Sequence, residues 1–146
     1  MDGGPAGARA DIFVLDTSAL LAFLYGERGG DRVESLLIRA SDGRVTVRLH
    51  RMHLCEVYYL FHRKGGEATA ESAVRDVEKL PIRIEDRVSP ALMREAGKIK
   101  AEYRVSFADA FAAGLAGVRK AILVSCDHAE FEPLESAGQV QVLWAR

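Results

Sequence analysis

Short apolar runs alternate along this chain with longer stretches in which apolar side chains recur at helical spacing. Runs of this first kind predict strands at 12–15, 45–47, 82–84, 121–125 and 140–144. The longer stretches predict helices at 19–25, 31–40, 52–64, 68–80, 89–103, 106–117 and 128–136. Because strands that alternate with helices form parallel sheets covered on both faces, we predict an α/β fold. The expected architecture is a three-layer α/β/α sandwich with a central, mostly parallel sheet.

An aspartate follows each of the two most apolar strand segments. Asp16 comes directly after 12–15, and Asp127 follows 121–125 with one residue between. In open parallel sheets, ligands bind outside the carboxyl ends of the strands, so both aspartates are candidate site residues. Asp16 suits a plain helix N-cap equally well. The two carboxylates meet only if their strands are neighbours, and the sequence does not decide that.

Two further acids lie within apolar helical segments. Glu56 is surrounded by apolar residues from Leu54 to Leu60, and Asp109 is the only charged residue between Ser106 and Val118. Glu56 could belong to a solvated stripe, and Asp109 could close a capping box with Ser106. We favour side chains that point into a functional site in both cases.

Four carboxylates in one place would repel one another and raise each other's pKa values. Divalent cations resolve that conflict, and a site made of carboxylate oxygens suits Mg²⁺ or Mn²⁺ rather than zinc. In two-metal sites the ions lie about 3.5–4 Å apart and act together on an in-line displacement at phosphorus.

Four segments resemble the motifs of the PIN domain family, in order and on the expected elements. They are 14–20 (VLDTSAL), 54–59 (LCEVYY), 106–110 (SFADA) and 123–127 (LVSCD), the last followed by Glu130 and Phe131. Each motif alone is weak, but the four together cover about residues 11–145. The one mild departure is Cys126, where many relatives carry a small residue. The compact single-domain form is similar to the VapC toxins of bacterial and archaeal toxin–antitoxin pairs.

The resemblance implies a PIN-like fold and a Mg²⁺- or Mn²⁺-dependent endoribonuclease. It also implies an RNA substrate, a cognate antitoxin that holds the protein inactive, and a homodimer. By this resemblance, the metal ligands are Asp16, Glu56, Asp109 and Asp127. Ser18 or Thr17 would hydrogen-bond a ligand carboxylate or a metal-bound water, Ser125 would support the site, and Glu130 is an extra acid ranked below the four.

Bulk properties set the remaining expectations. The chain has 146 residues, which fits one domain, with 1–10 as a flexible tail and 11–146 as the PIN domain. A formal net charge of -1 argues against a large basic face for nucleic acid. No run of 18 apolar residues occurs, so we expect no membrane span. Cys55 and Cys126 are interpreted as reduced, buried cysteines of a cytoplasmic protein.

Other functions fit the residues less well. A phosphatase with Asp16 as nucleophile requires a second aspartate two residues later, where this chain has Ser18. A phospho-receiver requires an acidic pair and a late lysine that do not appear in the corresponding places. A PIN nuclease of RNA processing outside a toxin–antitoxin pair stays open, as does a PIN fold that only binds.

Three histidines lie close to the predicted acids. His50 and His53 flank the start of the helix that carries Glu56, and His128 follows Asp127. Their spacing matches no zinc signature, so we expect them to support the site or to contact RNA. Residues 58–61 (YYLF) place many apolar side chains on one helix, and either a core or a partner surface explains them.

Overall fold

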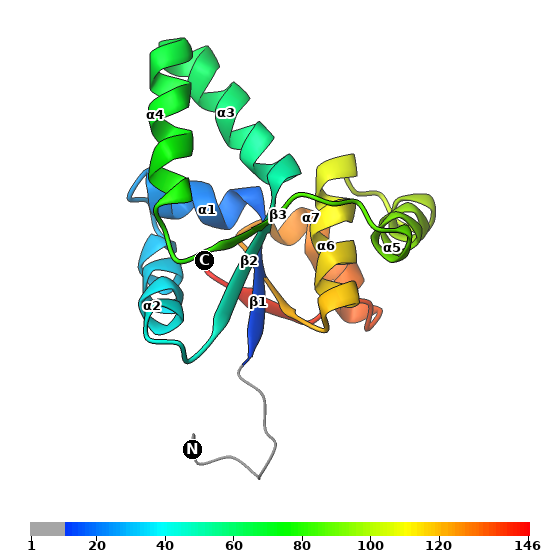
Figure 1. The fold of residues 1–146 in the computed structure, drawn as a ribbon. Coiled ribbons are helices and arrows are strands. Elements are labelled where there is room, and N and C mark those ends of the chain that lie inside the picture. The colour runs from blue at the N-terminus through cyan, green and yellow to red at the C-terminus, as the bar shows by residue number, and fades with distance from the viewer. Residues whose placement is uncertain (1–10) are drawn as a thin grey trace.

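The computed structural model describes residues 11–146, and the predicted tail at 1–10 lies outside the described residues. Five strands and seven helices follow one another in this part of the chain (Figure 1). The strands are β1 (Ile12–Leu15), β2 (Thr46–His50), β3 (Arg83–Glu85), β4 (Ile122–Ser125) and β5 (Val142–Trp144). The helices are α1 (Thr17–Leu24), α2 (Gly30–Ser41), α3 (Arg51–Gly65), α4 (Glu67–Glu78), α5 (Pro90–Glu102), α6 (Phe107–Arg119) and α7 (His128–Ser136).

The strands form one sheet in the order β3-β2-β1-β4-β5. All four pairings are parallel, so the predicted α/β class with a mostly parallel sheet is confirmed. Strand β1 lies between β2 and β4, with Val14 opposite Leu123 in the second pairing. The chain order reverses direction at β1, which makes the carboxyl ends of β1 and β4 the expected ligand site.

Each face of the sheet has its own apolar core, because side chains alternate along a strand. Phe13 and Leu15 of β1 and Val124 of β4 pack with residues of α1–α4. Val14 of β1 and Leu123 of β4 point the other way, into a core built with α5, α6 and α7. Figure 1 shows the two groups of helices on opposite sides of the sheet, which is the three-layer arrangement that the sequence predicts.

Strand β2 and helix α1 extend beyond their predicted ranges, and polar residues account for both extensions. Strand β2 is longer than the predicted 45–47 and includes Arg48 and His50. Arg48 is held in the structure by an ion pair with Glu85 of the edge strand β3, at 3.2 Å. Helix α1 begins at Thr17, two residues before the prediction, because the carboxylate of Asp16 accepts a hydrogen bond from the Ala19 amide and caps the helix.

The two cysteines are unbridged, as expected, but the prediction that they are buried is wrong. Cys55 is exposed and Cys126 is half-buried. Helix α3 buries His53, Leu54 and Val57, and its helical period turns Cys55 outward.

The expectation that no segment spans a membrane can be tested on the helices. No helix in residues 11–146 combines the length and the apolar composition that crossing a bilayer requires.

Candidate functional site

Asp16 lies at the carboxyl end of β1 and is 1% exposed. Three groups donate hydrogen bonds to its carboxylate: the Ala19 amide at 2.8 Å, the Ser18 hydroxyl at 2.8 Å and the Ser125 hydroxyl at 2.6 Å. Asp16 is therefore a helix N-cap, which is one of the two roles that the sequence allows. Its carboxylate is also held in a fixed position at the carboxyl end of the central strand β1.

Ser125, at the end of β4, connects the two strand ends. Its hydroxyl donates to Asp16 and accepts a hydrogen bond of 2.9 Å from the Asp127 amide. Ser18 adds a second connection, because its hydroxyl also accepts the Cys126 amide at 2.9 Å. The adjacency of β1 and β4 thus brings Asp16 and Asp127 to the same place, which the sequence alone left undecided.

Asp109 lies in the first turn of α6, which Ser106 caps by accepting the Asp109 amide at 3.1 Å. A capping box would also need the Asp109 carboxylate to reach back to the Ser106 amide. Glu130 of α7 takes that place instead, because its carboxylate accepts the Ser106 amide at 3.2 Å. The alternative in which Asp109 only closes a capping box is therefore wrong, and its carboxylate faces the other acids.

Asp109, Asp127 and Glu130 form a group that fits a metal ion. One carboxylate oxygen from each lies within 4.8 Å of the others. All three are half-buried, and α7 fixes two of them, because the Asp127 carboxylate caps this helix by accepting the Glu130 amide at 3.2 Å. Three convergent carboxylates are hard oxygen donors, so the residues present fit Mg²⁺ or Mn²⁺. Glu130, which is predicted to rank below the four acids, lies in this group together with Asp109 and Asp127.

Glu56 lies beside this group rather than in it. It is half-buried on α3, and its carboxylate accepts a hydrogen bond from the hydroxyl of Thr17, the first residue of α1. Thr17 directly follows Asp16, so the hydrogen bond attaches α3 to the carboxyl end of β1. All four predicted acids are therefore near the carboxyl ends of β1 and β4. Their role as metal ligands stays a prediction.

The electrostatics of the site favour a bound cation. Burial raises the pKa of Asp16 to about 6, against hydrogen bonds from Ser125, Ala19 and Ser18 that lower it, and the charge of Asp127 raises it further. Burial likewise raises the pKa of Asp109 to about 7, and the charge of Asp16 and contacts with Glu130 add to the increase. Within residues 11–146, no salt bridge involves Asp16, Glu56, Asp109, Asp127 or Glu130.

The histidines are placed differently from one another. His53 is completely buried and His50 is 4% exposed, so the expectation that they contact RNA is wrong for both. His128 is exposed, and its ring stacks on that of Trp144 with centroids 3.8 Å apart. Sequence reasoning placed His53 near the site but missed its partner, the Ala108 carbonyl of α6, because that contact joins residues 55 positions apart.

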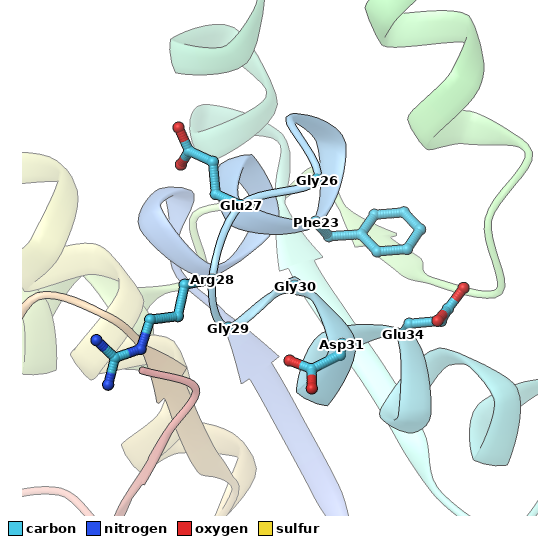
Figure 2. A pocket seen from close by; sticks show the side chains of 8 residues that line it. All are labelled: Phe23, Gly26, Glu27, Arg28, Gly29, Gly30, Asp31 and Glu34. Carbon is cyan, nitrogen blue, oxygen red and sulfur yellow. The ribbon is translucent and has the colours of Figure 1, made fainter.

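A surface hollow of about 480 Å³ lies elsewhere, at the loop between α1 and α2. Figure 2 shows Phe23, Asp31 and Glu34 on one side of this loop, with Arg28 pointing the other way. None of the predicted acids lines the hollow. The acids and their hydrogen bonds, rather than the size of a cavity, identify the candidate site.

The sequence and the fold are similar to those of known proteins. The family model of the PIN domain matches residues 13–134, which include all four predicted acids and Glu130. The chain belongs to the PIN domain family. The predicted family membership is thus confirmed. The comparison with curated protein sequences found no match.

Solved structures of VapBC and VapC proteins share this fold. A chain of the DNA-bound VapBC structure from Salmonella typhimurium has a TM-score of 0.73 and 18% identity, covering 93% of this chain and 99% of that one. VapBC2 from Rickettsia felis, bound to a DNA fragment from its promoter, has a TM-score of 0.70 and 16% identity, covering 91% and 98%. VapC20 from Mycobacterium tuberculosis, a toxin that cleaves the sarcin–ricin loop, has a TM-score of 0.62 and 22% identity, covering 90% and 98%.

Proposed function

We propose that this PIN domain is a divalent-metal-dependent endoribonuclease and the toxin of a toxin–antitoxin pair. The observation that carries the proposal is the convergence of Asp109, Asp127 and Glu130, with Asp16 buried beside them and without a cationic partner in the described chain. Two structurally similar chains come from VapBC structures, which supports the toxin–antitoxin assignment. A third, VapC20, is a toxin that cleaves the sarcin–ricin loop, which supports RNA as the substrate.

Each side chain has a distinct part in this proposal. Asp109, Asp127 and Glu130 hold Mg²⁺ or Mn²⁺ directly, and Asp16 and Glu56 complete the acidic wall. Ser125 and Ser18 keep the Asp16 carboxylate in one orientation, and Thr17 does the same for Glu56. When bound, the ion supplies Lewis-acid chemistry at a phosphodiester group and neutralises charge that develops on its oxygens.

The acids also determine how RNA approaches. Their negative charge repels a phosphate backbone unless cations are bound, so the metal is needed for binding as well as for chemistry. A single-stranded or looped RNA fits best, because its backbone is accessible and its bases are unstacked.

The partner assignments belong to the same proposal. A cognate antitoxin binds the toxin and blocks its acidic site, and the toxin itself is a homodimer. Co-expression tests the first point: a small protein encoded beside this one should relieve growth inhibition and co-purify with the chain. Sedimentation of the purified chain tests the second, and a monomer at micromolar concentration would contradict it.

Cleavage by purified protein tests the enzymatic proposal. With Mn²⁺, the wild type should cut structured cellular RNA, and Asp16→Asn or Asp109→Asn should abolish cutting. A matched control is Asp76→Asn, an exposed acid of α4. Equal cutting by the site variants, or by the wild type in excess chelator, would contradict the proposal.

A further inference from the structure

His53 joins the two helices that carry Glu56 and Asp109. Its Nε2 lies 2.8 Å from the Ala108 carbonyl oxygen at the start of α6. A carbonyl only accepts, so Nε2 carries the proton and donates. Helix α3 otherwise packs mainly on α4, α1 and β2, and α6 on α5, β1 and β4. The two helices begin close together in Figure 1, and the His53 bond is a direct connection between them.

The bond lies between two acids of the site. Glu56 is three residues after His53, which places it one helical turn further along α3. Asp109 directly follows Ala108, whose carbonyl receives the hydrogen bond. This hydrogen bond therefore helps to set where the first turn of α3 lies relative to the first turn of α6.

At position 53, an imidazole stabilises the fold less than an aliphatic side chain would. His53 is 0% exposed, and its Nδ1 has no hydrogen-bond partner within the described residues. Burial lowers the pKa of His53, which disfavours a second proton on the ring. A buried polar atom without a partner destabilises the folded state. An aliphatic side chain of similar size would leave no such atom, but it could not donate the hydrogen bond to Ala108.

His50, three residues earlier, gives a direct contrast. Its Nδ1 accepts the Met52 amide at 3.1 Å, and its Nε2 lies 3.0 Å from the Arg87 carbonyl oxygen, to which it donates. Both ring nitrogens are thus satisfied, and the residue caps α3 and holds the segment that leads to α5. Both ring nitrogens of His50 therefore have partners, whereas only Nε2 of His53 has one.

We propose that His53 is a positioning residue, whose hydrogen bond to Ala108 fixes the Glu56 and Asp109 carboxylates relative to each other on the two walls of the acidic site. The inference rests on the proposed function, because it gives this geometry a purpose in holding a divalent ion. His53 itself does not contact RNA, since it is completely buried.

Two substitutions separate positioning from packing. His53→Leu fills the space but cannot donate, and His53→Gln keeps an N–H that reaches the Ala108 carbonyl. We expect His53→Leu to keep or raise the melting temperature and to weaken Mn²⁺ binding about 10-fold or more, as the loss of groups that orient metal ligands does. His53→Gln should recover most of the Mn²⁺ affinity. The control His50→Asn should lower the melting temperature and leave the Mn²⁺ affinity of the folded protein near the wild-type value.

Amide hydrogen exchange of the metal-free proteins measures the connection without any ion. Residues 54–57 should exchange faster in His53→Leu than in the wild type, and His53→Gln should restore their protection. A large fall in the melting temperature of His53→Leu, equal exchange in all three proteins, or wild-type Mn²⁺ affinity in His53→Leu would each overturn the positioning role. If the wild type binds no Mn²⁺, the proposed function fails, and the exchange data still decide whether His53 holds the two helices together.

Discussion

Thr17 and Glu56 are 39 residues apart in the chain, and the Thr17 hydroxyl donates a hydrogen bond to the Glu56 carboxylate. The contact connects the first residue of α1 with the middle of α3, next to Asp16 at the end of β1. Of the described hydrogen bonds, it is the one that fixes Glu56 to the strand end where the other acids meet.

Removing the Thr17 hydroxyl should weaken metal binding without unfolding the protein. Thr17→Val keeps the β-branched shape but loses the donor, so the Glu56 carboxylate becomes mobile. Groups that orient metal ligands contribute about 10–100-fold in affinity when the ligands are direct, and we expect a loss near the lower end of that range. Calorimetric titration with Mn²⁺ measures it. Thr17→Ser, which keeps the hydroxyl, is the matched control, and equal affinity in Thr17→Val would contradict the role.

Glu130 should contribute to metal binding as strongly as Asp127. Glu130→Gln removes one of three convergent carboxylates while keeping the side-chain size and an acceptor for the Ser106 amide. We expect Mn²⁺ affinity to fall by about 10-fold or more, by the same argument for metal-binding groups. Glu132→Gln, an exposed acid on the same helix, should bind Mn²⁺ like the wild type. If Glu130→Gln and Glu132→Gln bind Mn²⁺ with the same affinity, Glu130 does not belong to the metal site.

Stability of the metal-free protein should decrease as pH rises. Asp109 has an ordinary pKa of 3.8 and a pKa of about 7 in the folded protein, raised mainly by burial. Between these values the folded protein holds more protons than the unfolded one, so the free energy of unfolding falls as pH rises from about 4 to about 7. Asp109→Asn removes the charge and should raise the melting temperature at pH 8 by a few degrees, because about 1 kcal/mol shifts it by roughly 2–4 °C at this size.

Melting curves in chelator at pH 5 and pH 8 check this prediction. The difference between Asp109→Asn and the wild type should be large at pH 8 and small at pH 5. Saturating Mn²⁺ should stabilise the wild type and not the variant. A variant that is less stable than the wild type at pH 8 without metal would show that the carboxylate is not destabilising, against the electrostatic account.

Ser125→Ala should make metal binding more sensitive to acid. The Ser125 hydroxyl lowers the pKa of Asp16, which is about 6 in the folded protein. Without this hydrogen bond the pKa rises further, and protons compete with Mn²⁺ at higher pH. The affinity loss should therefore be several-fold greater at pH 6 than at pH 8. Titrations at the two pH values measure this, and the same loss at both would mean that Ser125 acts only through packing.

Most of the fold could be predicted from the sequence, because the spacing of apolar residues indicates which of them are buried. The run at 12–15 and the helix start at Ser89-Pro90 are local signals, and the structure has elements in both places. The extension of β2 through Arg48 to His50 was not readable. Arg48 lies in a strand because it pairs with Val14 of β1 and Arg83 of β3, and Glu85 balances its charge. Pairing between distant segments leaves no local pattern.

The candidate site was predicted in part, for the same reason. Asp16 and Asp127 stand out because each follows an apolar run, but their proximity depends on β1 and β4 being neighbours. Glu130 is predicted only as an extra acid ranked below the four, because its closeness to Asp109 depends on how α7 packs beside α6. The partner of His53 is a backbone carbonyl, which no side-chain motif marks.

Anomalous diffraction from crystals soaked in Mn²⁺ tests the central claim most directly, because it locates the ion independently of activity. We predict an anomalous peak within coordination distance of carboxylate oxygens from Asp109, Asp127 and Glu130, with Asp16 next to it, and loss of the peak in Asp109→Asn. A peak elsewhere on the surface, or none at a saturating Mn²⁺ concentration, would contradict the account.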